Sequence, residues 1–144
     1  ELDIPLFVCA TNMQKSKSFY FSEGELYHKL LASCAVPGIF RPVELDGDLY
    51  SDGAVLDNFP IQPFADDSTT MVGSFLRAPI SISRKDLSST RKVIKRSIIL
   101  QRQEIEREKL LKPDISIVHN LNSFSAFKKK DAQLMYEFSS ELFA

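Results

Sequence analysis

The stretch from Ala32 to Ile61 reads ASCAVPGIFRPVELDGDLYSDGAVLDNFPI, and it decides how the rest of the chain is interpreted. Near its middle lie two short extended segments, Pro42 to Leu45 and Leu49 to Ser51. Between them stands Asp46-Gly47, a dipeptide that favours a two-residue turn with positive φ at both positions. The pattern predicts a β-hairpin.

Asp52 directly follows the second of these segments, and Gly53 follows Asp52. In α/β proteins the loops just beyond the strand ends form the binding crevice. We expect Gly53 to turn the chain at positive φ and to leave room beside the carboxylate of Asp52. Asp52 is therefore a candidate site residue, although most Asp-Gly turns are purely structural.

Strand-like and helical segments alternate along the chain. The expected strands cover residues 4–10, 19–21, 70–76 and 114–118, and the expected helices run from 26 to the Pro37-Gly38 break, from 88 to 111, and through Leu134, Phe138 and Leu142. Such alternation is typical of an α/β fold with a largely parallel sheet.

Two helices carry more detailed signals. Ser22 and Glu25 have the spacing of a capping box, in which each side chain accepts the backbone amide of the other residue. In the helix over residues 88–111, Ile94, Ile98 and Ile105 recur near the helical period and predict a buried stripe.

The composition is that of an ordinary globular protein. The chain has 144 residues, of which 44% are hydrophobic and 26% charged, and its 18 basic and 19 acidic residues give a net charge of −1. This length fits one domain. The chain has no excess of basic residues of the kind that indicates nucleic-acid binding. No apolar run approaches the ~20 residues of a membrane-spanning helix.

Several motifs, taken in order, resemble the patatin-like phospholipase family. They are Ala10-Thr11-Asn12, Phe21-Ser22-Glu23-Gly24, ASCAVPGIF from Ala32 to Phe40, Pro42-Val43, YSDGAV from Tyr50 to Val55, Phe59-Pro60-Ile61, Pro113-Asp114-Ile115, and FSAF at 124–127. The resemblance covers nearly the whole chain and is nearer to the bacterial and neuropathy-target-esterase-like branches than to the plant storage proteins. It implies the C-terminal half of a three-layer α/β domain with a mostly parallel sheet.

The resemblance also implies a chemistry. Members of the family hydrolyse lipid acyl esters with a serine–aspartate dyad, and the aspartate belongs to a D-G-[GA] motif that maps onto Asp52, Gly53 and Ala54. Asp52 is then the general base that takes the serine proton and later activates water. We expect a partly buried carboxylate, because burial makes it a better base near neutral pH.

The nucleophile of such a dyad is not found in this sequence. No pair among the five glycines brackets a serine as G-x-S-x-G, and there is no glycine-rich loop for an oxyanion hole. In the family both elements precede the aspartate block, so we expect them upstream of residue 1. Residues 1–144 are then the C-terminal portion of a single domain, inactive without the rest.

Three other interpretations remain open. A Ser-His-Asp hydrolase has the chain order Ser, Asp, His, which Asp52 and His119 also satisfy. The second interpretation is a non-catalytic binding domain that keeps a hydrolase fold. Metal-dependent hydrolysis is the least favoured, because Asp46, Asp48, Asp52 and Asp57 lack the spacing of a calcium-binding loop and no histidine joins them. Asp57-Asn58 is better explained as a turn ahead of Pro60.

The expected partner is a lipid or acyl-ester substrate, with possible peripheral contact to a membrane, and neither a cofactor nor a metal is expected. Cys9 and Cys34 lie in apolar surroundings and are expected to be reduced core residues, which favours a reducing compartment weakly. The sequence does not define the acyl chain, the head group or the oligomeric state.

Overall fold

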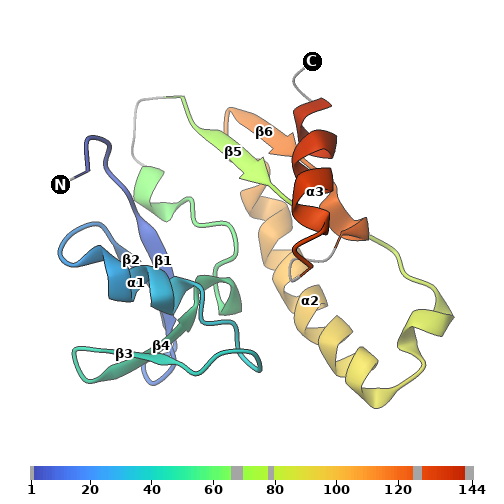
Figure 1. Cartoon of the computed structure of the whole chain (residues 1–144), viewed down its shortest axis with the longest axis horizontal. Helices are drawn as coiled ribbons and strands as arrows, with labels where there is room; N and C mark the ends of the chain where they lie inside the picture. The colour runs from blue at the N-terminus through green and yellow to red at the C-terminus, as the bar shows by residue number, and fades with distance from the viewer. Residues whose placement is uncertain (1, 66–69, 78–79, 125–127, 142–144) are drawn as a thin grey trace. The chain divides into compact units, whose positions relative to one another are not determined.

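The computed structural model describes residues 2–65, 70–77, 80–124 and 128–141 (Figure 1). The chain divides into two compact units, residues 1–67 and residues 68–144, and each is described by itself. The expectation of one domain is not tested by this division and stays a prediction.

The first unit contains a four-stranded sheet in the order β2-β1-β4-β3. The strands are β1 (Val8–Asn12), β2 (Lys17–Phe21), β3 (Val43–Leu45) and β4 (Asp48–Asp52). All three pairings are antiparallel, so the expected mostly parallel arrangement is wrong for this sheet. The reason is the length of the connections, because the tight turns that follow β1 and β3 can only join antiparallel neighbours.

Strand β1 is buried along its whole length. All five of its residues are buried, since it pairs with β2 on one side and with β4 on the other. The strand begins later than expected, at Val8, and Ile4 before it is 78% exposed. The hydrophobic core joins Ala10 of β1, Tyr50 of β4 and Ala32 of the following helix, with four partly buried side chains packed around them: Phe19, Phe21, Val43 and Leu45.

The predicted hairpin is confirmed. Val43 pairs with Tyr50 and Leu45 with Asp48, leaving Asp46 and Gly47 as the two turn residues. Their φ angles are 51° and 81°. Positive φ at both positions is the conformation that an Asp-Gly hairpin turn requires.

Helix α1 (Leu26–Ser33) begins with a different cap from the one expected. Its N-cap is Glu25, whose carboxylate accepts the amides of Tyr27 at 2.8 Å and His28 at 3.1 Å. The capping box at Ser22 is wrong because Gly24 lies between the two residues at φ 80°, outside the helical region.

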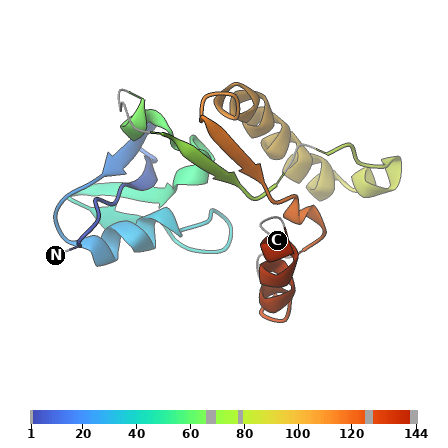
Figure 2. The same ribbon diagram turned by 90° about the horizontal axis from the view of Figure 1, so that it is seen from above.

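The second unit contains a parallel pair of strands, β5 (Val72–Phe75) and β6 (Ile115–Val118). Helix α2 (Thr90–Lys109) connects them, as a parallel pairing requires, and the two strands lie side by side in Figure 2. Helix α3 (Asp131–Ser140) follows. Short 3₁₀ turns complete the two units: η1 (Gly53–Val55), η2 (Gln62–Phe64), η3 (Arg84–Leu87) and η4 (Leu121–Ser123).

The expected buried stripe of α2 is wrong. Ile94, Ile98 and Ile105 are each more than half exposed, and the buried residue of this helix is Glu106. Leu142, expected on the last helix, lies outside the described residues. Among the residues that the structure describes, no helix combines the length and the apolar character needed to cross a bilayer.

Taken together, the described residues combine helices with one antiparallel sheet and one parallel strand pair. This mixture is compatible with the expected α/β class. The three-layer arrangement stays a prediction.

Candidate active site around Asp52

Two backbone neighbours fix Asp52 at the end of β4. Asp52 is the last residue of the strand and pairs with Ala10 of β1. Its backbone amide donates to the carbonyl oxygen of Ala35, just beyond α1, over 3.1 Å. The strand pairing and this bond hold the Cα of Asp52 between β1 and the end of α1, and the residue is half-buried.

The carboxylate of Asp52 is oriented by the turn that follows. Asp52 is the N-cap of η1, and its Oδ1 accepts the backbone amide of Ala54 over 2.8 Å. This contact fixes the orientation of the carboxylate. Oδ2 has no hydrogen-bond partner within residues 2–65 or the other described ranges, so this oxygen is open to a hydrogen-bond donor.

Gly53 has a different role from the one expected. Its φ is not in the left-handed region, so the expectation of a positive φ is wrong. A Cβ at this position would instead lie 2.7 Å from the carbonyl oxygen of Cys9 and 2.8 Å from its Sγ. Glycine is required here because the turn passes directly against the backbone of β1.

Asp57 lies in the loop that follows η1 and is only 5% exposed. Its Oδ1 accepts the amide of Phe59 over 3.2 Å, which confirms the turn predicted ahead of Pro60. Its Oδ2 accepts the hydroxyl of Tyr20, on β2, over 2.6 Å. This second contact was not predicted, since no sequence pattern connects two residues that lie 37 positions apart.

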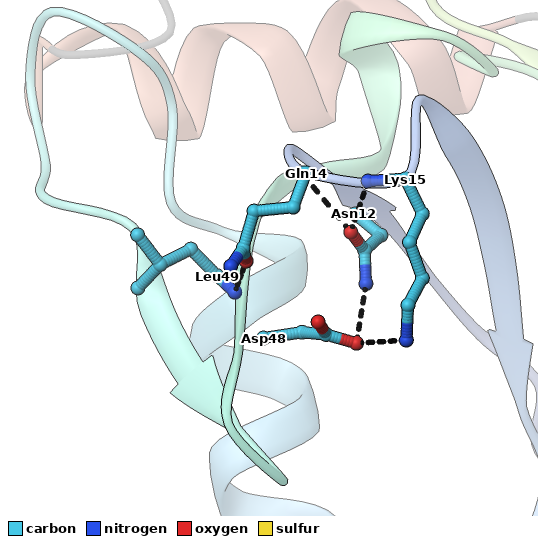
Figure 3. Close-up of polar contacts among 5 residues, drawn as sticks. All are labelled: Asn12, Gln14, Lys15, Asp48 and Leu49. Atoms are coloured by element: carbon cyan, nitrogen blue, oxygen red, sulfur yellow. Dashed lines mark hydrogen bonds and ion pairs between the residues drawn. The ribbon is translucent and has the colours of Figure 1, made fainter.

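A second polar cluster lies at the opposite end of β4 (Figure 3). Asn12 is fully buried, and its Oδ1 accepts the amides of Gln14 and Lys15 at 3.1 and 2.8 Å. Its Nδ2 donates to Oδ2 of Asp48 over 3.0 Å, and the ammonium of Lys15 contacts the same oxygen. The Lys15 contact lowers the pKa of Asp48 from its ordinary value. The cluster ties the β1–β2 turn to the start of β4.

The four aspartates considered for a metal site are engaged separately. Asp48 contacts Asn12 and Lys15, Asp52 contacts Ala54, and Asp57 contacts Tyr20. Asp46 forms the hairpin turn. Within the described part of the chain, no three His, Cys, Asp or Glu side chains are grouped so that they could hold a metal ion.

His119, the alternative catalytic residue, lies in the second unit just after β6. It is 9% exposed, and its Nε2 lies 2.9 Å from Oγ of Ser74 on β5. Its backbone amide donates to the carbonyl oxygen of Phe75 over 2.9 Å. The side chain therefore has a partner within its own strand pair, which is typical of a structural histidine. No motif in the sequence indicated a role for Ser74.

Residues 8–65 are similar to a known protein family. This segment matches the model described as patatin-like phospholipase. It contains Asp52, Gly53 and Ala54 together with the Tyr20–Asp57 contact.

Individual relatives agree with this match. Uncharacterized NTE family proteins of Mycobacterium bovis and Mycobacterium tuberculosis are 42% identical over 65 residues, which are 45% of this chain and 18% of theirs. A protein named lysophospholipase NTE1 from Cryptococcus neoformans is 33% identical over 64 residues, 44% of this chain and 4% of its own. The chain thus spans less than a fifth of the length of these curated relatives.

Proposed function

Since residues 8–65 match the model of the patatin-like phospholipase family, we propose that the complete protein is a lipid acyl hydrolase in which Asp52 is the general base of a serine–aspartate dyad. The family and the lysophospholipase name of one relative support hydrolysis of a lipid ester in general. That the nucleophile is activated by a serine–aspartate dyad, with Asp52 as its base, is a more specific proposal.

The reaction is acyl transfer in two steps. Asp52 takes the proton of the serine hydroxyl as that oxygen attacks the ester carbonyl. Asp52 then gives this proton to the alcohol oxygen of the lipid, whose bond to the acyl carbon breaks as the acyl-enzyme forms. In the second step Asp52 takes a proton from water as the water oxygen attacks the acyl-enzyme, and it returns this proton to the serine oxygen as the fatty acid is released. The serine comes from outside residues 1–144 in this proposal, because no G-x-S-x-G occurs in the sequence.

The observation that carries the proposal is the way the carboxylate of Asp52 is held. Oδ1 is oriented by the amide of Ala54, and Oδ2 is the oxygen to which a serine hydroxyl would donate. A general base must lie within hydrogen-bond reach of the proton that it takes, in a fixed orientation. The turn over Gly53–Val55 supplies that orientation.

The substrate is proposed only as a class. A lipid acyl ester agrees with the family, and the choice among phospholipid, lysophospholipid and simple ester depends on a pocket that also includes the nucleophile. We also propose contact of the complete protein with a membrane surface, where lipid substrates lie.

The test is ester hydrolysis by the complete protein and two variants. Asp52→Asn keeps the size of the side chain but removes the base, and should lower kcat for a p-nitrophenyl ester by about 10²–10⁴-fold. Asp46→Asn is the matched control, because it makes the same exchange in the exposed turn of the same hairpin. Equal rates for Asp52→Asn and the wild type would remove Asp52 from the mechanism.

A further inference from the structure

The contact between Tyr20 and Asp57 has no role in the reaction as described above. The hydroxyl of Tyr20 donates to Asp57 Oδ2 over 2.6 Å, and Asp57 is almost fully buried. A carboxylate removed from water is unfavourable unless hydrogen bonds replace its hydration. Both oxygens of Asp57 have such a bond, since Oδ1 accepts the amide of Phe59.

The backbone of Asp57 reaches back to the residue after Asp52. Its amide donates to the carbonyl oxygen of Gly53 over 2.8 Å. The hydroxyl of Thr11, on β1, donates to the same oxygen over 3.3 Å. Asp57 and β1 therefore hold the Gly53 peptide from two directions.

We propose that Tyr20 and Asp57 are positioning residues that orient the general base Asp52. This inference rests on the proposed function. Tyr20 fixes the side chain of Asp57, and Asp57 fixes the carbonyl of Gly53. The turn anchored in this way presents the amide of Ala54 to Asp52 Oδ1 at 2.8 Å.

The protonation of Tyr20 agrees with this role. Burial, together with the hydrogen bond to Asp57, raises the pKa of Tyr20 well above its ordinary value of 10.0. The phenol is therefore neutral near pH 7 and donates a hydrogen bond to Asp57.

The test is a double-mutant cycle in the complete protein. Tyr20→Phe keeps the aromatic ring and removes only the hydroxyl. We expect kcat for a p-nitrophenyl ester to fall about tenfold with little change in KM, because small displacements of a catalytic group are costly. Tyr27→Phe on α1 is the control, since Tyr27 is 62% exposed, and it should keep the wild-type rate.

The cycle separates positioning from general stability. If Tyr20 acts through Asp52, Tyr20→Phe has no further effect on the residual rate of Asp52→Asn. If Tyr20→Phe lowers kcat by the same factor in the wild type and in Asp52→Asn, the inference is overturned. It is also overturned if Tyr20→Phe keeps the wild-type kcat while Asp52→Asn loses most of its activity. The proposed function would remain intact in that second case. A fully active Asp52→Asn protein would instead refute the proposed function itself.

A second pair of variants covers the case in which Tyr20→Phe does not fold at the assay temperature. Asp57→Asn keeps an oxygen for the amide of Phe59 and a polar partner for Tyr20, whereas Asp57→Ala removes both. We expect the kcat of Asp57→Asn to lie between those of the wild type and Asp57→Ala. Equal losses in kcat for the two variants, measured well below their melting temperatures, would contradict the positioning role.

Discussion

Replacing Gly53 by alanine tests the close contact between the turn after Asp52 and strand β1. The added Cβ would lie 2.7 Å from the carbonyl oxygen of Cys9 and 2.8 Å from its Sγ. Real Cβ atoms do not approach other heavy atoms so closely, and the carbonyl belongs to the backbone of a fully buried strand. The turn therefore has to move away from β1.

The size of the effect follows from two opposing contributions. Overpacking a well-packed site costs about 1–3 kcal/mol, and the immobile carbonyl argues for the upper end. Since the φ of Gly53 is outside the left-handed region, alanine also restricts the unfolded chain, which stabilises by about 0.4–1 kcal/mol. We expect a net loss of about 2 kcal/mol in the free energy of unfolding.

The assay compares stability with activity in the complete protein. Denaturant unfolding gives the loss of stability, and p-nitrophenyl ester hydrolysis should show kcat reduced at least about tenfold, because the displaced turn carries the amide that orients Asp52. Gly47→Ala is the control. Gly47 has open space around it but a φ of 81°, so alanine there costs about 1–2 kcal/mol and should leave kcat unchanged.

A further variant identifies the source of the strain. Adding Cys9→Ala to Gly53→Ala removes the sulfur but leaves the Cys9 carbonyl, so only part of the stability should return. Wild-type stability and kcat for Gly53→Ala alone would refute the close contact and, with it, the explanation given for this glycine.

Two further predictions concern how the first unit is built. Glu25→Gln tests the cap of α1. The hydrogen bond from the amide of His28 is the main cause that lowers the pKa of Glu25 from its ordinary value of 4.5. The charged cap therefore stabilises the fold above pH 4.5, and this stabilisation is lost as the pH falls through the lowered pKa of Glu25 in the folded protein. The difference in melting temperature between wild type and Glu25→Gln should therefore be largest at neutral pH and disappear in acid; a constant difference would contradict the cap. Asn12→Ala removes the acceptor for the amides of Gln14 and Lys15 and should lower the free energy of unfolding by about 2 kcal/mol, measured by denaturant titration; a loss near zero would mean that this turn does not depend on Asn12.

Local signals in the sequence predicted those parts of the fold that neighbouring residues determine. The turn at Asp46-Gly47 was predictable because few dipeptides accept two positive φ angles, and the structure confirms it. The long helix and the strand after it were also found within two residues at each end. The cap of α1 was misassigned because the capping-box pattern carries no information on the conformation of Gly24.

Contacts between distant segments were not predictable in this way. The antiparallel order of the four-stranded sheet depends on which strands pair. The hydrophobic periodicity of a strand does not indicate which strand it pairs with. The role of Gly53 depends on its contact with Cys9, which lies 44 positions earlier. The Tyr20–Asp57 contact depends on the pairing of β1 with β2 and of β1 with β4. Asp52 itself was singled out by motif resemblance, and no local pattern would have distinguished it from an ordinary turn residue.

The central claim is that Asp52, without His119, activates the nucleophile. The most direct measurement compares Asp52→Asn and His119→Ala in the complete protein, with kcat/KM for one ester substrate. We expect a loss of about 10²–10⁴-fold for Asp52→Asn. The rate of His119→Ala should be nearly unchanged, because the contact of His119 with Ser74 lies within its own strand pair. A wild-type rate for Asp52→Asn, or a loss of nearly all activity in a folded His119→Ala protein, would contradict it.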